Sequence, residues 1–300
     1  MDIGRICIVG GSGFVGRSIA AQAAARGIRV RVLTRRAAHA RPLLVLPTLE
    51  VAEARAYDEA TLAERFRGCD AVVHLVGILH EGGGETFRGV HAELPGRVAR
   101  ACRAAGVKRL LHMSALGASA RGPSEYQRSK AAGEEAVRTA GDSIAATIFR
   151  PSVIFGEDDA FLNMFARLVR AAPVIPLAAA HSRVQPIWVE DVARCFVASL
   201  GDPRTFGQAY ALCGPRSYAL DELLGYVGRI LGRKPAIVPL PGALAYLQAF
   251  ALEHLPGKLM TRDNLRTLAV DNVSREPFPA VFGFQPAALE AVVPSYLARR

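Results

Sequence analysis

The 300-residue sequence contains little lysine, one tryptophan and no segment of simple composition. Only 4 of its 37 basic residues are lysine, and no run of five basic residues occurs. A nucleic-acid-binding surface needs clustered positive charge with aromatic residues or a reading module. The diffuse net charge of +10 therefore predicts no nucleic-acid partner. It favours a solvated basic surface, with attraction to an acidic partner or an anionic membrane as the alternative.

Paired cysteines and long apolar runs are also missing. The five cysteines are odd in number, widely spaced and without a CxxC pattern, which predicts buried thiols in a reducing compartment. The apolar stretch 236–256 is broken by Pro239, Pro241 and Gln248 before it reaches spanning length. The strand-like segment at Arg5 leaves no room for a signal peptide before it. We expect a cytoplasmic protein, with a location peripheral to the inner membrane as the alternative.

What the sequence does have is enough apolar residues, 51%, for a sizeable core. The first 36 residues predict a strand at Arg5–Val9, a helix over Gly13–Arg26 and a second strand over 28–33. Gly10, Gly13 and Gly16 form GxxGxxG at the turn between strand and helix. In this context the glycines indicate a tight turn, close approach of a pyrophosphate and close helix–strand packing. The alternative is a purely structural glycine turn.

The end of the second predicted strand bears on the choice of cofactor. NAD sites place an acid there to bind the ribose 2′-hydroxyl. This chain has Thr34, Arg35 and Arg36 and no carboxylate nearby in the sequence. Guanidinium groups suit a 2′-phosphate, so the pattern favours NADP(H), with NAD(H) as the alternative.

The middle of the chain alternates between helices and strands. The predicted elements are a helix at Asp58–Phe66, a strand at Asp70–Leu79, a glycine-rich loop at His80–Phe87, a helix at Pro95–Ala105 and a strand at Lys108–Leu116. This alternation predicts an α/β fold with a Rossmann-type, doubly wound parallel sheet. We expect the cofactor domain over residues 1–155, with 183–213 returning to its sheet. Residues 156–182 and 214–300 should form a smaller C-terminal lobe for a substrate or partner.

The segment SEYQRSK places a tyrosine and a lysine one helical turn apart. Ser124 and Gln127 form a capping-box pattern, so a helix should start there with Tyr126 and Lys130 on one face. Ser114 lies at the end of the preceding predicted strand. A phenol next to an ammonium, which lowers the phenol pKa, suits proton transfer to or from a carbonyl, and a serine hydroxyl can orient the substrate oxygen. The alternative is an ordinary pair on a helix surface.

Together, GGSGFVG, the Ser114/Tyr126/Lys130 set and FRPSVIFG resemble the extended and atypical short-chain dehydrogenase/reductase superfamily. More narrowly, HLVGIL, SKAAGEEAV, RPSVIFGEDDAFLNMFA and QPIWVEDVA resemble the NADPH-binding accessory subunit of respiratory complex I and its bacterial relatives. That subgroup is often labelled NAD-dependent epimerase/dehydratase. The likeness covers nearly the whole chain.

The resemblance implies roles for several sets of residues. The pyrophosphate would be lined by residues of the glycine turn: Gly10, Ser12, Gly13, Phe14, Val15 and Gly16. Arg35 and Arg36 would meet the 2′-phosphate, whereas Leu75, Val76 and Gly77 would lie under the adenosine and ribose. Ser114, Tyr126 and Lys130 fall on catalytic positions, and Lys130 would also hold the ribose. Pro151 and Val153 would face the nicotinamide with their backbone.

Two positions depart from the superfamily pattern. Arg55 stands where many members place an acid near the adenine, and His91 replaces an asparagine that completes a catalytic tetrad in many short-chain enzymes. The second departure puts a relayed proton path in doubt.

Other polar residues are better explained by structure than by catalysis. His74, His80, His91 and His112 are scattered over separate elements, so they are interpreted as structural rather than metal-binding. The acids Glu157, Asp158 and Asp159 should cap a helix, and Asp191 should cap or orient the helix that follows it.

Two functions compete at this level. The first is an NADP(H)-dependent oxidoreductase acting on an alcohol or carbonyl, or a redox epimerase, through Ser114, Tyr126 and Lys130. The second is a non-catalytic NADPH-binding protein with a structural, assembly or sensing role beside respiratory complex I. The apolar C-terminal region is expected to pack on the core, with docking onto a membrane-associated partner as the alternative. The intact catalytic set favours the first. A monomer and a homodimer are both compatible with the sequence, and the small-molecule substrate is undefined.

Overall fold

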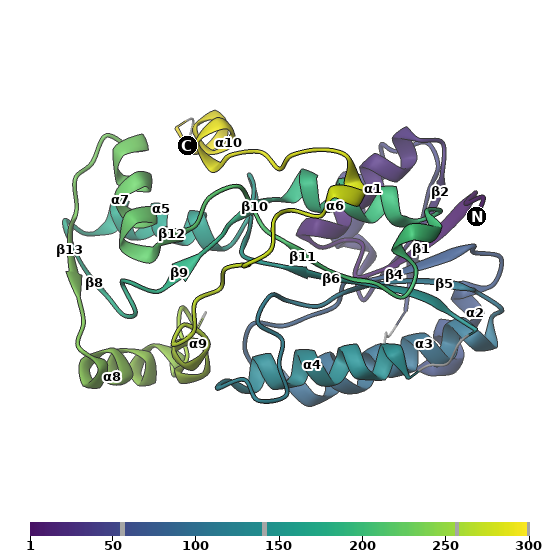
Figure 1. The fold of residues 1–300 in the computed structure, drawn as a ribbon, viewed down its shortest axis with the longest axis horizontal. Coiled ribbons are helices and arrows are strands. Elements are labelled where there is room, and N and C mark those ends of the chain that lie inside the picture. Colours follow the sequence, from purple (N-terminus) through teal and green to yellow (C-terminus); the bar gives the residue numbers. More distant parts are fainter. Residues whose placement is uncertain (55–57, 140–142, 256–257, 299–300) are drawn as a thin grey trace.

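The computed structural model describes residues 1–54, 58–139, 143–255 and 258–298. Seven parallel strands form its central sheet, in the order β11-β6-β5-β4-β1-β2-β3 (Figure 1). Their bounds are β1 (Arg5–Val9), β2 (Arg29–Thr34), β3 (Leu49–Glu53), β4 (Ala71–His74), β5 (Arg109–Met113), β6 (Ala145–Pro151) and β11 (Ala209–Leu212). The strand order reverses between β1 and β4, where ligands bind in folds of this type. The predicted Rossmann-type sheet is confirmed.

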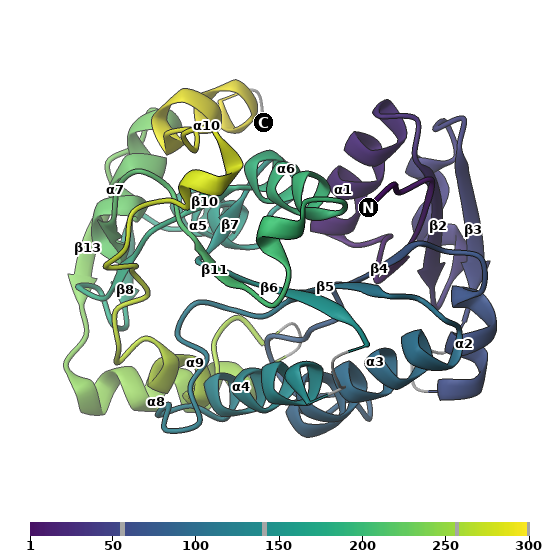
Figure 2. The same cartoon turned by 45° about the vertical axis from the view of Figure 1, so that its right-hand side comes forward.

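Helices cover both faces of the sheet (Figure 2). One face carries α1 (Phe14–Ala25) and α6 (Val189–Ser199), and the other carries α2 (Glu59–Phe66), α3 (Leu94–Ala104) and α4 (Glu125–Arg138). Strand β1 shows why both layers form, because its side chains alternate between the faces. Ile6 and Ile8 belong to the core under α1 and α6, whereas Cys7 and Val9 belong to the core under α2 and α3. All five cysteines are buried free thiols, as predicted.

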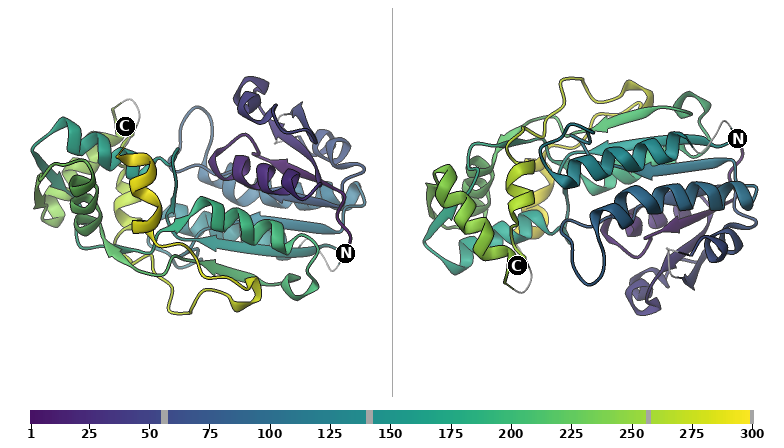
Figure 3. Two further views of the ribbon diagram at one scale, coloured as in Figure 1. Left: turned by 90° about the horizontal axis from the view of Figure 1, so that it is seen from above. Right: turned by 90° about the horizontal axis from the view of Figure 1, so that it is seen from below.

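The smaller lobe lies at one end of the sheet (Figure 3). Its helices are α5 (Phe161–Ala171), α7 (Leu220–Ile230), α8 (Gly242–Glu253), α9 (Arg262–Thr267) and α10 (Leu289–Leu297). Its short strands are β7 (Ile154–Phe155), β8 (Val174–Leu177), β9 (Arg183–Val184), β10 (Ile187–Trp188), β12 (Tyr218–Ala219) and β13 (Ala236–Pro239). Short helical turns η1 (Ala37–Leu43), η2 (Arg88–Glu93), η3 (Pro203–Thr205) and η4 (Ala280–Phe282) complete the described elements. None of the described helices is long and apolar enough to cross a bilayer.

Residues 183–213 return to the sheet, as expected, but only their last part joins it as a strand. The apolar segment RVQPIWV, residues 183–189, forms two separate strands, β9 and β10, which pair with β12 and β7 outside the main sheet. The return is made by α6, which packs on α1, and by β11, which pairs with β6. Pro186 lies between the two short strands and removes a backbone donor there, so a continuous strand is disfavoured. The strand expected over Asp70–Leu79 is also shorter, because β4 ends at His74.

Helix α4 packs unusually closely against the turn η2. η2 is a π-helical turn, and a Cβ on Gly133 of α4 would lie 1.9 Å from the carbonyl oxygen of His91 in that turn. Only glycine therefore lets the two elements pack at this distance. The contact matters because both elements carry residues of the candidate site.

Replacing Gly133 with alanine should separate α4 from η2 and lower the free energy of unfolding by about 1–3 kcal/mol, because overpacked contacts force backbone shifts. Gly242 at the start of α8 is a matched control, since its added Cβ would meet nothing within 4 Å. Gly242→Ala should be neutral or slightly stabilising. Urea unfolding of both variants measures the difference, and equal stabilities would contradict the proposed close packing.

Candidate functional site

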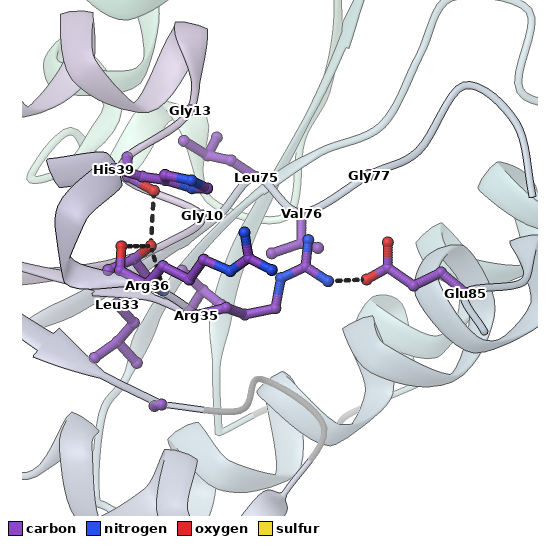
Figure 4. Close-up of a pocket in the computed structure, with 14 residues that line it drawn as sticks. Gly10, Gly13, Leu33, Arg35, Arg36, His39, Leu75, Val76, Gly77 and Glu85 are labelled. Carbon is purple, nitrogen blue, oxygen red and sulfur yellow. Dashed lines mark hydrogen bonds and ion pairs between the residues drawn. The ribbon is translucent and has the colours of Figure 1, made fainter. Parts of the chain in front are cut away.

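A cavity of about 500 Å³ opens at the carboxyl ends of β1, β2 and β4. The glycine turn, the end of β2 and the segment after β4 form its walls (Figure 4). It is lined by Val9, Gly10, Ser12, Gly13, Leu33, Thr34, Arg35, Arg36, His39, Ala54, Leu75, Val76, Gly77 and Glu85. Most residues predicted to hold a dinucleotide are thus brought together around one cavity of suitable size.

The glycine turn gives the backbone room at the base of the cavity. Gly10 has a φ of 85°, and a Cβ on Gly16 would lie 2.6 Å from Gly11 Cα. Gly16 therefore lets α1 pack closely on the backbone of the glycine turn, and it does not line the cavity. Phe14 and Val15 begin α1, and Phe14 faces a different groove beside Trp188. Ser12 and Gly13, which directly precede α1, line the cavity, so the amino end of this helix lies at the cavity wall and favours an anion there.

Two guanidinium groups lie next to each other across the cavity, those of Arg35 and Arg36 (Figure 4). Arg35 Nη1 forms an ion pair with the Oε1 atom of Glu85. The sequence interpretation found no acid near these arginines, and it missed both Glu85 and His39. Glu85 lies in the glycine-rich loop, fifty residues after Arg35 in the chain. Because the two are so far apart, the local sequence did not predict their contact.

Helix α4 begins where the capping box predicted. Ser124 Oγ accepts the N–H of Gln127, and the Gln127 side chain accepts the N–H of Ser124. Tyr126 and Lys130 share one face, with Lys130 Nζ 5.9 Å from the centre of the tyrosine ring. Neither residue lines the cavity, but a Cβ on Gly77 would lie 3.2 Å from Lys130 Nζ. Lys130 Nζ therefore lies against Gly77, which is one of the residues that line the cavity.

Lys130 is buried and poorly partnered. Within the described residues its one hydrogen bond is long, 3.4 Å from Nζ to the carbonyl oxygen of Met113. Burial lowers the pKa of Lys130 to about 8, although Glu134 one turn later favours the charged form. An ammonium with unused donors beside a glycine-lined cavity fits the hydroxyl groups of a ribose.

Tyr126 is half-buried, and its neighbourhood differs from the expectation. Burial raises the pKa of Tyr126 to about 12, so the lowering predicted from the nearby ammonium is not found. The phenol therefore carries its proton throughout the neutral range. That state suits a proton donor, and a base would need a different environment.

Ser114 follows β5, and its buried hydroxyl makes no hydrogen bond of good geometry among the described residues. It lies close enough to affect Glu134. Burial alone would raise the pKa of Glu134, but Arg150, Ser114 and Arg138 together hold it below its usual value. Arg150 binds both carboxylate oxygens of Glu134. Ser114 is thus buried within reach of the Glu134 carboxylate, and it does not line the cavity.

His91 has a structural role, and its protonation follows from its bonds. Its Nε2 accepts the N–H of Ile78 at 3.0 Å, so the proton resides on Nδ1 and is donated to Ser129 Oγ at 3.1 Å. Ser129 in turn donates to the carbonyl oxygen of Tyr126. Burial and the Lys130 charge lower the pKa of His91 to about 2. A neutral imidazole therefore connects the cavity wall to the tyrosine-bearing helix.

His74 and His112 form a second buried pair on adjacent strands. Their Nδ1 atoms lie 3.0 Å apart, and neither Nε2 has a described partner. Burial, together with the Lys130 charge, lowers the pKa of His74 to about 3. Within the described ranges, no group of three or more His, Cys, Asp or Glu side chains is placed to hold a metal ion.

The remaining predictions have mixed outcomes. Asp159 accepts the N–H of Leu162 and so caps α5, as expected, and Asp158 pairs with Arg17. Asp191 does not precede its helix, because α6 begins at Val189; its carboxylate instead binds the N–H of Ala287. Arg55 lies outside the described residues.

Pro151 and Val153 lie at the carboxyl end of β6, away from the cavity lining. Their carbonyl groups accept the N–H groups of Leu116 and Ile187, respectively. Asn272 was missed by the sequence interpretation. Its side chain accepts the Ser152 hydroxyl and donates to the carbonyl of Leu116, so it ties together the segments after β5 and β6.

Proteins of known name are similar to this chain in sequence. The subunit named NADH dehydrogenase [ubiquinone] 1 alpha subcomplex subunit 9, mitochondrial, of Mus musculus is 31% identical over 298 residues, covering 94% of this chain and 77% of that protein. A protein named ceramide reductase from Caulobacter vibrioides is 32% identical over 238 residues, covering 79% of this chain and 74% of that one.

Solved structures share the fold. The dTDP-glucose 4,6-dehydratase DesIV of Streptomyces venezuelae, solved with NAD and TYD bound, has a TM-score of 0.76 at 18% identity, covering 98% and 95% of the two chains. WbmG of Bordetella bronchiseptica, solved with NAD, has a TM-score of 0.74 at 20% identity over 98% and 93%. The family model described as NAD dependent epimerase/dehydratase matches residues 6–213. This chain, with its glycine-turn cavity and its tyrosine–lysine helix, belongs to the NAD-dependent epimerase/dehydratase family.

Proposed function

We propose that this protein is an NADP(H)-dependent reductase of a carbonyl compound, with Tyr126 as proton donor, Lys130 as ribose anchor and Ser114 as the group that orients the substrate oxygen. The observation that carries the proposal is the burial of Lys130 next to Gly77, where its ammonium makes one long hydrogen bond to the residues that the structure describes. A buried ammonium is costly and needs a compensating interaction. The reductase name of the Caulobacter relative supports the direction of the reaction.

The residues present fit a dinucleotide. The glycine turn and the amino end of α1 would hold the pyrophosphate, Arg35 and Arg36 a 2′-phosphate, and Lys130 the nicotinamide ribose. Glu85 would be displaced from Arg35 in that arrangement, and its loop would move with it. A bound nicotinamide would supply the hydride.

The chain's own groups complete the chemistry. As hydride adds to the carbonyl carbon, the C=O π bond breaks and its electrons move to the oxygen. The Tyr126 phenol gives that oxygen its proton, which forms the alcohol and leaves a phenolate. Lys130 stabilises the phenolate electrostatically until solvent restores the proton. Ser114 donates a hydrogen bond to the same oxygen beforehand.

A second candidate is a non-catalytic NADPH-binding protein attached to a respiratory complex. The observation that favours it is the surface of α8, whose exposed side chains include Leu244, Tyr246, Leu247 and Phe250. Gly242–Leu252 carries no charged residue, and Glu253 is paired with Arg262. The complex I subunit of mouse suggests a protein occupant for this surface. Nucleotide that survives extensive dialysis would favour this candidate, because a turnover enzyme must release its cofactor.

The reductase is tested by incubating the protein and NADPH with a soluble quinone, a long-chain aliphatic ketone and a nucleotide-linked ketosugar. We expect NADPH consumption with one of these classes and a loss of about 10²- to 10⁴-fold in Tyr126→Phe, because the proton donor is removed. Tyr210→Phe, at the distant strand β11, should keep full activity. Turnover unaffected by Tyr126→Phe would refute the assigned role, and a preference for NADH would refute the roles of Arg35 and Arg36.

Lys130 should be a functional residue that destabilises the fold. Its pKa falls from 10.5 unfolded to about 8 folded, so the folded state binds fewer protons between these values and stability should rise with pH across that window. Lys130→Met should raise the free energy of unfolding at pH 7 by about 3 kcal/mol, remove the pH dependence in that window and abolish NADPH binding. Exposed Lys108→Met is the control. Destabilisation by Lys130→Met would indicate a structural lysine.

The second candidate predicts that α8 holds the protein in a respiratory complex. Native electrophoresis of solubilised membranes from the natural host should show the protein migrating with NADH dehydrogenase activity. Leu247→Glu, which places a charge at an exposed apolar position, should release it. Val45→Glu, at an exposed apolar position far from α8, should not. If the unmodified protein migrates apart from the NADH dehydrogenase activity, the second candidate function is refuted.

A further inference from the structure

Residues adjacent in the sequence do not supply acceptors for all the free N–H groups at the amino end of α4. The first N–H groups of a helix have no partner within the helix and need an external acceptor. Ser124 serves the N–H of Gln127, but it does not reach those of Glu125 and Tyr126. One of the two groups left over is thus the backbone N–H of the tyrosine at the candidate site.

Asp263 of the C-terminal lobe supplies both missing acceptors. Its Oδ1 accepts the N–H of Glu125 at 2.8 Å, and its Oδ2 accepts the N–H of Tyr126 at 3.1 Å. The carboxylate comes from 137 residues further along the chain. Figure 2 shows α9, which carries Asp263, beside the end of α4. A carboxylate at this end is also favoured by the helix dipole.

The segment around Asp263 is fastened by polar contacts. Asn264 Nδ2 donates to the carbonyl oxygen of Leu79, and Lys258 Nζ donates to that of Glu81. Arg262 ties α9 back to Glu253 at the end of α8. No residue of α9 is fully buried, so its position depends on these bonds more than on apolar packing. Segments held in this way open at low free-energy cost.

We propose that Asp263 is a positioning residue, through which the C-terminal lobe sets the placement of Tyr126. The Asp263 carboxylate fixes the first turn of α4. Asn264 and Lys258 of the same segment bind the loop after β4, at Leu79 and Glu81. Loss of this contact would leave the cofactor cavity intact but let the tyrosine drift from its productive position. The catalytic part of this inference rests on the proposed reductase function; the structural coupling does not.

The coupling is tested by amide hydrogen exchange on the full-length protein, without cofactor. In Asp263→Ala the amides of Glu125 and Tyr126 should exchange at least tenfold faster, because they lose their acceptor. Asp263→Asn keeps one acceptor oxygen and should show a smaller increase. Asp58→Ala, which removes a carboxylate cap from α2, is the matched control and should leave these two amides unchanged. Unchanged exchange in Asp263→Ala would overturn the proposal.

Kinetics then test the positioning role. With the substrate found in the reductase screen, Asp263→Ala should lower kcat by about ten- to a hundredfold with little change in the Kd for NADPH. Asp263→Asn should recover part of the lost kcat, and Asp58→Ala should keep the parent value. Faster exchange without a fall in kcat would overturn the positioning role. A protein that turns over none of the substrates would count against the proposed function, whereas the exchange result would still decide the coupling.

Discussion

The ammonium group of Lys130 is held almost wholly out of water, and much of the site is organised around that one charge. Burial and the nearby cation together lower the pKa values of His74, His91 and His112, so three imidazoles stay neutral beside it. In the neutral His91 ring, the N–H of Ile78 bound at Nε2 fixes the tautomer and so the direction of the bond to Ser129. Glu134 offsets part of the charge from one turn below. The lysine charge therefore acts on groups from several elements at once.

The local parts of the fold could be predicted from the sequence. The strand–glycine turn–helix unit, the alternation that gives a parallel sheet and the capping box before Tyr126 all depend on residues within one or two turns of each other. The ends of the strands could not be predicted in the same way. An apolar run such as Asp70–Leu79 does not show where pairing stops and the cavity wall begins.

The rest of the site could not be predicted, because its contacts join distant segments. Glu85 reaches Arg35 from a loop on another strand, Asn272 bridges two strand ends, and Asp191 turns to a backbone group near the C-terminus. Each of these residues has an ordinary polar neighbourhood in the sequence. Their partners are decided by how the lobe folds back over the sheet, and the expectation of a lowered tyrosine pKa failed because burial outweighs a cation at 5.9 Å from the ring.

The edge strand β11 comes from chain that has already passed through the smaller lobe. Strand β6 has no second neighbour until residues 209–212 arrive, and α1 lacks its partner helix until α6 has formed. During synthesis the cofactor domain would emerge with one open edge and one uncovered face, and it would be completed only late. The two parts are therefore not separable modules. We expect them to fold as one unit, since a cut after residue 155 would remove both β11 and α6 from the sheet layers.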